Sequence, residues 1–185
     1  SLSFGSEVVF SSEYVGYVNS VYDVATGKAV VFYSDQGAVG RCYVGTVSGT
    51  SISFGSQVDA GTQTSSYSQT SAYDSVNQKI VIARQKSSYG EAFVGTVSGT
   101  SISFGSAVTF ETSNVSLNVG GLAYNPATGK FVLGYRERVN NYGQCKVGTV
   151  SGTSISFGAL EGFNSSNSQN IVVSSDPTSN HVVIY

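Results

Sequence analysis

The chain has 185 residues, a formal net charge of -2 and only 11% charged residues. Val, Ile, Tyr and Phe recur throughout, so a hydrophobic core is available and disorder driven by charge is excluded. The pI is near 5.2 and no basic run occurs, which argues against nucleic acid as a partner. No apolar stretch approaches the length of a membrane span, so membrane insertion is not expected.

An internal repeat organises the sequence. The motif S-(L/I)-S-F-G recurs with spacings of 50, 50 and 53 residues, and VGTVSGT precedes each later copy. The motif begins at Ser1, Ser51, Ser101 and Ser154. We therefore expect a single repeat domain over 1–185, with units 1–50, 51–100, 101–153 and an incomplete 154–185.

Each unit is predicted to contain four short antiparallel strands, because apolar and polar side chains alternate and β-branched and aromatic residues are frequent. In chain order the first unit has Ser1–Phe10, Tyr17–Asp23, Lys28–Ser34 and Arg41–Val47, which we call the first to fourth strands of a unit. The S-G-T sequence predicts a tight turn from the fourth strand into the next first strand. The D-x-x-T-G-K sequence predicts another from the second strand to the third.

Four antiparallel strands in about 50 residues match the size of a propeller blade. We therefore predict an all-β fold, a β-propeller of four-stranded blades, with a β-solenoid as the alternative architecture. The tight turns suggest that the connection from third to fourth strand crosses between blades. The fourth strands, with Val44–Val47, Val94–Val97 and Val147–Val150, would then line the axis, and Ser34, Gln85 and Arg136 would end the outermost strands.

This grouping gives fifteen strands, with the fourth strand of the first blade missing. A four-bladed ring would be closed by one more strand after Tyr185, which would pair with the strand that starts at Ser1. Further repeats would make a larger ring. The sequence is therefore expected to be a fragment of a longer chain.

The phrase VGTVSGTSISFGS, followed by YDxATGKxVV, resembles repeats of marine bacteriophage structural proteins and bacterial surface proteins, usually interpreted as β-propellers. The resemblance covers the whole chain. It implies a structural or adhesive part of a virion or cell surface, with other subunits of that assembly as partners, and not a catalyst. The G-H to W-D, kelch and sialidase signatures of other propellers do not occur, so their activities are not implied.

Conventional catalytic groups are scarce. His181 is the only histidine and is predicted to lie in a solvated hairpin, so no Ser-His-acid or Cys-His arrangement is available elsewhere. Cys42 and Cys145 occupy one strand position in different units, where a disulfide would be too long, and are predicted to be small buried thiols.

Acidic and amide side chains recur at one turn position: Asp23, Asp74, Asn125 and Asp176. One such group per turn caps a turn but does not make a calcium loop, so no metal and no cofactor is expected. A glycosidase would need a pair of carboxylates from separate loops. The candidates for that pair are Glu13, Asp35, Glu111 and Glu137.

Antiparallel pairing places both tight turns on one face and the variable connections on the other. Variation confined to one face is typical of a recognition surface, although neutral drift in loops gives the same pattern. The candidate contact residues are Tyr14, Asp35, Gln36, Lys86, Tyr89, Arg136, Arg138, Asn140, Asn141 and Tyr142. Tyr with Asn, Gln and Asp suits sugar hydroxyls or a protein partner.

Three functions remain open at this point. The first is a non-enzymatic propeller module of a virion tail or fibre, or of a cell-surface protein, that acts as a scaffold or adhesin. The second is a lectin-like glycan-binding domain, and the third is a glycosidase. The loop from Arg136 to Gly143 brings two of the nine basic residues together, and we expect it to contact a neighbouring subunit or an acidic receptor glycan.

Overall fold

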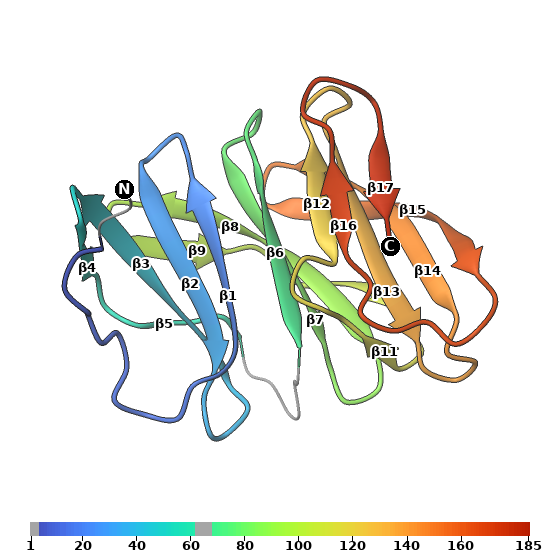
Figure 1. Cartoon of the computed structure of the whole chain (residues 1–185), viewed down its shortest axis with the longest axis horizontal. Helices are drawn as coiled ribbons and strands as arrows, with labels where there is room; N and C mark the ends of the chain where they lie inside the picture. Colours follow the sequence, from blue (N-terminus) through green and yellow to red (C-terminus); the bar gives the residue numbers. More distant parts are fainter. Residues whose placement is uncertain (1–3, 62–67) are drawn as a thin grey trace.

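The computed structural model describes residues 4–61 and 68–185, which form an all-β structure (Figure 1). Its strands make three five-stranded antiparallel sheets and one two-stranded sheet. In Figure 1 the sheets follow one another in chain order from left to right. No helix that could cross a membrane is found in the described part of the chain.

Each large sheet has the same order of strands. The first contains β1 (Gly16–Asp23), β2 (Lys28–Ser34), β3 (Gly40–Ser48), β4 (Ser51–Phe54) and β5 (Val58–Asp59). The second contains β6 (Gln69–Asp74), β7 (Lys79–Gln85), β8 (Gly90–Ser98), β9 (Ser101–Phe104) and β10 (Val108–Glu111). The third contains β11 (Val115–Ser116), β12 (Leu122–Asn125), β13 (Lys130–Glu137), β14 (Gly143–Ser151) and β15 (Ser154–Asn164). The last sheet pairs β16 (Val173–Ser175) with β17 (Val182–Ile184).

The predicted grouping of strands is wrong in one respect. The third and fourth strands of a unit are hydrogen-bonded neighbours, since β2 pairs with β3 from Lys28↔Thr46 to Ser34↔Gly40. The loop between them closes as a hairpin, with the Asp35 N–H donating to the Val39 carbonyl at 3.0 Å. Each sheet therefore joins the second, third and fourth strands of one unit to the first strand of the next. The chain crosses between sheets after the first strand.

The VGTV strands consequently do not form the innermost edge. Second strands meet from sheet to sheet instead: the Val173 N–H donates to the Gly120 carbonyl at 2.8 Å, and Ser175 Oγ donates to the Tyr124 carbonyl at 2.6 Å. The glycine of VGTV is explained by the neighbouring first strand. A Cβ atom on Gly45 would lie 2.7 Å from Ile52 Cδ1, so glycine there leaves room for the neighbouring first strand.

The prediction of a strand over Ser1–Phe10 also needs correction. Ser1–Ser3 lie outside the described residues, and residues 4–10 have no strand conformation. The later first strands pair with a fourth strand of the preceding unit, as β4 pairs with β3. Residues 4–10 pair with no strand of the described chain, and Phe4 is 90% exposed.

The core lies between consecutive sheets, and β7 shows how the sequence builds it. Ile80 and Ile82 belong to the apolar cluster shared with the first sheet, while Val81 and Ala83 belong to the cluster shared with the third. Successive side chains of a strand point to opposite faces, so an uninterrupted apolar run supplies both clusters.

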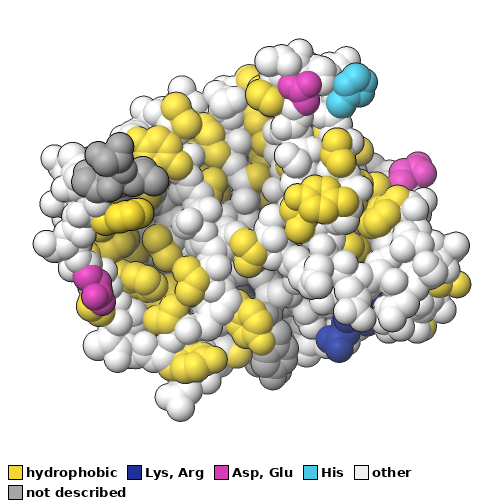
Figure 2. All heavy atoms as spheres, viewed as in Figure 1, with side chains coloured by type: hydrophobic (Ala, Val, Ile, Leu, Met, Phe, Trp, Pro, Cys, Tyr) yellow, Lys and Arg dark blue, Asp and Glu magenta, His cyan; other side chains and the backbone are white. Residues whose placement is uncertain are grey.

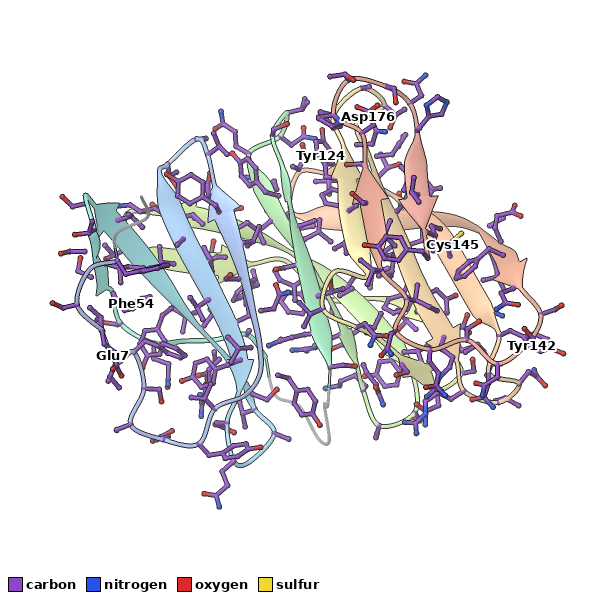
Figure 3. The ribbon with its side chains drawn as sticks, viewed as in Figure 1. Glu7, Phe54, Tyr124, Tyr142, Cys145 and Asp176 are labelled. Carbon is purple, nitrogen blue, oxygen red and sulfur yellow. The ribbon has the colours of Figure 1, made fainter. Side chains whose placement is uncertain are left out.

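The two tight turns are confirmed. Asp23 Oδ1 accepts the N–H groups of Ala25 at 3.0 Å and Thr26 at 3.2 Å, and Gly27 has φ +68°. The equivalent carboxylate or amide of Asp74, Asn125 and Asp176 caps its turn in the same way. These turns lie at one end of the sheets, and the third-to-fourth loops lie at the other, as Asp176 and Tyr142 show in Figure 3. We call the latter the variable end.

Candidate functional site

Two hollows at the variable end share Ser116 and Arg136 as lining residues, and we call the pair the inter-sheet hollow. The larger has a volume of about 470 Å³ and is lined by Tyr17, Ser68, Gln85, Ser116, Leu117, Arg136 and Arg138. The smaller has a volume of about 180 Å³ and is lined by Ser116, Asn118, Arg136, Gln169 and Asn170. The lining residues come from all four repeat units, so the hollow exists only where consecutive units meet.

The backbone at the start of the second strands turns residues toward this hollow. Tyr17, Ser68 and Asn170 occupy one repeat position, five residues before Tyr22, Tyr73 and Ser175. Tyr17 has φ +51° and Asn170 has φ +54°, in the left-handed region that residues with side chains adopt rarely. Pairing of β1 with β2 is irregular between Gly16 and Asn19. Strained conformations of this kind cluster at functional sites, and they cost about 1–3 kcal/mol each.

The hollow has an uncompensated positive charge. Arg136 is half-buried at the end of β13, Arg138 is exposed, and neither side chain has an ion-pair partner among the described residues. Glu137 lies between them in sequence but is buried, and its carboxylate accepts the N–H groups of Val139 and Asn140. In Figure 2 basic side chains reach the surface over the lower ends of β11 and β13, and the visible acidic side chains lie elsewhere.

A second hollow collects three of the predicted contact residues. It has a volume of about 630 Å³ and is lined by Ser12, Glu13, Tyr14, Asp35, Gln36, Gly37 and Arg41. Asp35 holds the loop there, because Oδ1 accepts the N–H groups of Gly37 and Val39 at 2.9 Å and Oδ2 accepts Arg41 Nε at 3.0 Å. Burial acts to raise the pKa of Asp35, but these bonds outweigh it and lower the pKa below 3.8.

Lys86 and Tyr89 lie in the loop between β7 and β8, outside both hollows. Lys86 Nζ is 3.9 Å from Glu91 Oε1, and burial lowers the pKa of Lys86. Burial and, after it, the charge of Glu91 raise the pKa of Tyr89. These two residues therefore surround the buried pair of Arg84 and Glu91, whose Nε and Oε1 atoms are 2.6 Å apart.

Asn140, Asn141 and Tyr142 shape the loop that follows Arg138. The Asn140 N–H donates to Glu137 Oε2 at 2.9 Å, and Asn141 has φ +63°. The Asn141 carbonyl accepts the Ser168 N–H at 2.9 Å, which ties this loop to the segment that follows β15. The ring of Tyr142 is partly exposed at the variable end (Figure 3).

Of the predicted contact residues, Arg136 and Arg138 line the inter-sheet hollow, and Tyr14, Asp35 and Gln36 line the second one. The sequence prediction missed the remaining polar residues of the inter-sheet hollow. Those residues are Tyr17, Ser68, Gln85, Ser116, Asn118, Gln169 and Asn170. Alignment of the units would have placed Tyr17, Ser68 and Asn170 together, but their orientation depends on the left-handed backbone.

The remaining reactive groups fit structural roles. Ser179 Oγ donates to Asp176 Oδ2 at 2.9 Å and lies 3.2 Å from His181 Nδ1, so the serine stands between the acid and the histidine in an exposed turn. A nucleophile–base–acid sequence needs the histidine in the middle.

Cys42 and Cys145 are free thiols, the first buried and the second half-buried. Within residues 4–61 and 68–185, no cluster of three or more His, Cys, Asp or Glu could hold a metal ion.

Two of the four carboxylates considered for glycoside hydrolysis line the same hollow, and the other two lie elsewhere. Glu13 and Asp35 line the second hollow. Glu111 Oε2 accepts a hydrogen bond from the Tyr135 hydroxyl at 3.0 Å, and Glu137 Oε2 accepts one from the Asn140 N–H of the loop that follows β13. The inter-sheet hollow is lined by none of these four groups.

Comparison with known proteins adds no further assignment: no family model and no curated protein matches the chain.

Proposed function

We propose that the chain is a non-enzymatic recognition module, a propeller-type repeat domain of a virion tail or fibre or of a cell-surface protein. It acts as an adhesin whose contact site is the inter-sheet hollow. The observation that carries this proposal is the convergence of one repeat position from different units, Tyr17, Ser68 and Asn170, on a polar hollow with two arginines. The virion or surface location rests on the resemblance of the VGTVSGTSISFGS repeats.

A propeller-type arrangement is supported by the way the sheets follow one another. The second strands β1, β6, β12 and β16 contact each other in succession, as the Gln69 Nε2 donation to the Tyr17 carbonyl at 3.3 Å shows for the first two. Strands that start each sheet and meet at a common line are typical of blades around an axis.

A glycan is the ligand class that the lining favours. The side chains of Ser116, Asn118, Gln169 and Asn170 supply donors and acceptors that sugar hydroxyls need. The Ser68 hydroxyl is already bonded within the protein, because it donates to Gln85 Oε1 at 3.2 Å and accepts the Leu117 N–H at 3.3 Å. Tyr17 and Leu117 add apolar surface on which a sugar ring can pack. The larger hollow, about 470 Å³, falls within the usual range of small-molecule sites.

The test is binding to a glycan array and to target cells by the wild-type protein and by a triple variant, Arg136→Ala, Arg138→Ala and Tyr142→Ala. We expect unchanged circular dichroism and weakened binding or assembly. Lys79→Ala is the control, because Lys79 follows a tight turn at the opposite end of the sheet. Unchanged attachment and assembly by the triple variant would contradict the proposal, and release of reducing sugar from a bound glycan would favour a glycosidase instead.

A further inference from the structure

The four arginines of the chain fall into two classes. Arg41 pairs with Asp35 and Asp59, and Arg84 pairs with Glu91. Arg136 and Arg138 pair with no carboxylate in the described chain. Only 11% of the residues are charged, so charges placed without a partner contrast with the rest of the molecule.

The nearest acid in sequence is kept away from both arginines. Glu137 is 6% exposed, and both of its carboxylate oxygens accept hydrogen bonds from the Val139–Asn140 loop. Alternation along β13 directs Arg136 and Glu137 to opposite faces. Glu137 therefore forms no ion pair with Arg136 or Arg138.

The two parts of the hollow differ in chemistry. All five lining residues of the smaller part are polar, and Asn118 Nδ2 donates to Asn170 Oδ1 at 3.4 Å across it. The larger part adds the apolar surface of Tyr17 and Leu117. Arg136 and Ser116 line both parts and so lie where the two parts join. A planar fork of N–H donors at that place matches a carboxylate.

We propose that the inter-sheet hollow selects carboxylate-bearing sugars, with the carboxylate held by Arg136 and the sugar ring against Tyr17 and Leu117. Arg138, exposed at the rim, adds attraction for the anion without a fixed contact. This inference rests on the proposed glycan-binding function and specifies its ligand.

The experiment compares two probes that differ in charge, a galacturonic acid trisaccharide and its fully methyl-esterified form, by isothermal titration calorimetry at low salt. We expect the acid to bind at least ten-fold more tightly than the ester. Raising the ionic strength should weaken binding of the acid and leave the ester unaffected, because salt screens only the charged contact. Arg136→Gln should abolish the preference for the acid, Arg136→Lys should retain part of it, and Lys79→Ala should leave it unchanged.

The outcomes separate this inference from the proposed function. Equal binding of acid and ester, with loss of both in the Arg136→Gln variant, would overturn charge selection and leave a glycan-binding hollow. Preference for the acid that persists in Arg136→Gln would overturn the role of Arg136. Absence of binding of either probe by the wild-type protein would overturn the selection of uronic sugars, whereas failure of the triple variant to lose cell attachment would overturn the proposed function itself.

Discussion

The backbone at Gly105 lies so close to the carbonyl oxygen of Thr153 that a Cβ atom on this glycine would overlap that oxygen. Gly55 stands in the same relation to Thr100, and Gly5 to Thr50. The glycine of the first three copies of the motif therefore approaches a tight turn, whereas a Cβ atom on Gly158 of the fourth copy would lie 3.7 Å from the Val147 carbonyl oxygen. The recurrence of SISFG and SGT together follows from this one contact between consecutive units.

We predict that Gly105→Ala destabilises the protein by about 1–3 kcal/mol, because backbone must move to admit the methyl group. Chemical denaturation of the variant and the wild-type protein measures this loss. Gly162→Ala is the control, since Gly162 lies on β15, has no positive φ and has no heavy atom within 4 Å of the Cβ position. Equal stability of Gly105→Ala and Gly162→Ala would show that the contact with Thr153 is not tight in solution.

The contact between the first and second sheets differs in chemistry from the contact between the second and third. Phe110 packs on Tyr135 and Phe157 with ring centroids 5.3 and 5.8 Å apart, and Phe10 packs on Tyr33 in the same way. The equivalent positions of the second unit are Ala60 and Arg84. The Arg84 guanidinium donates to the Ala60 carbonyl and lies 4.7 Å from the Phe93 ring centroid, so one arginine replaces an aromatic pair.

We predict that Arg84→Tyr alone costs about 3 kcal/mol, because it removes the guanidinium from the buried Glu91 carboxylate and leaves, among the described residues, the longer ion pair with Lys86 at 3.9 Å. The triple variant Ala60→Phe, Arg84→Tyr, Glu91→Gln copies Phe110, Tyr135 and Gln144 of the third unit and should recover most of that loss. Urea denaturation of single and triple variants measures both effects. A triple variant no more stable than Arg84→Tyr would show that the two interfaces are not interchangeable.

Local features of the fold were predictable from the sequence, and strand partners were not. The strand predicted over Lys28–Ser34 has the same bounds in the structure, and the Asp23 turn forms as expected, because alternation and turn chemistry act within a few residues. The loop 35–39 is compatible in length with a hairpin or with a crossing between sheets. Only the pairing of β2 with β3 decides between them, and that contact is set by packing.

The site was predictable to the same partial extent. Composition singled out Arg136 and Arg138, which line the inter-sheet hollow. Tyr17 and Asn170 were missed because the direction of their side chains depends on a positive φ. The sequence does not predict a positive φ at a tyrosine. Lys86 and Tyr89 were chosen for their place in a variable loop. In the structure this loop lies beside the buried ion pair of Arg84 and Glu91, and Lys86 also pairs with Glu91.

The pKa of Asp35 predicts a pH dependence of stability. Its folded-state pKa is lowered, so its contribution is present above the ordinary value of 3.8 and is lost as the pH falls through the folded-state pKa. We expect Asp35→Asn to be less stable than the wild-type protein at pH 7. The variant should also lose less stability than the wild-type protein as the pH falls below 4. Thermal unfolding of both proteins across this range measures the slopes. Parallel curves would show that Asp35 has the same pKa in the folded and unfolded states.

The two thiols are predicted to differ in reactivity. Cys42 has no exposed surface, its Sγ is 3.5 Å from the Val58 carbonyl, and burial, with a smaller contribution from Asp59, raises its pKa to about 12. At pH 8 about one Cys42 side chain in ten thousand would then be a thiolate, and only the thiolate attacks thiol reagents. Burial raises the pKa of Cys145 as well, but this side chain is half-buried on β14 and remains within reach of solvent.

Under native conditions we therefore expect a disulfide reagent such as dithionitrobenzoate to label Cys145 first. Cys42 should react only when the first sheet opens, so its labelling rate reports unfolding of the core between the first and second sheets. Mass spectrometry of digests taken over time assigns each label, and Cys145→Ser isolates the slow reaction. Addition of urea below the unfolding midpoint should increase the labelling rate of Cys42 and leave the labelling rate of Cys145 nearly unchanged. Labelling of both thiols at one rate in the wild-type protein would mean that the sheet carrying Cys42 opens without global unfolding, and that the interface it forms with the second sheet is weaker than its packing indicates.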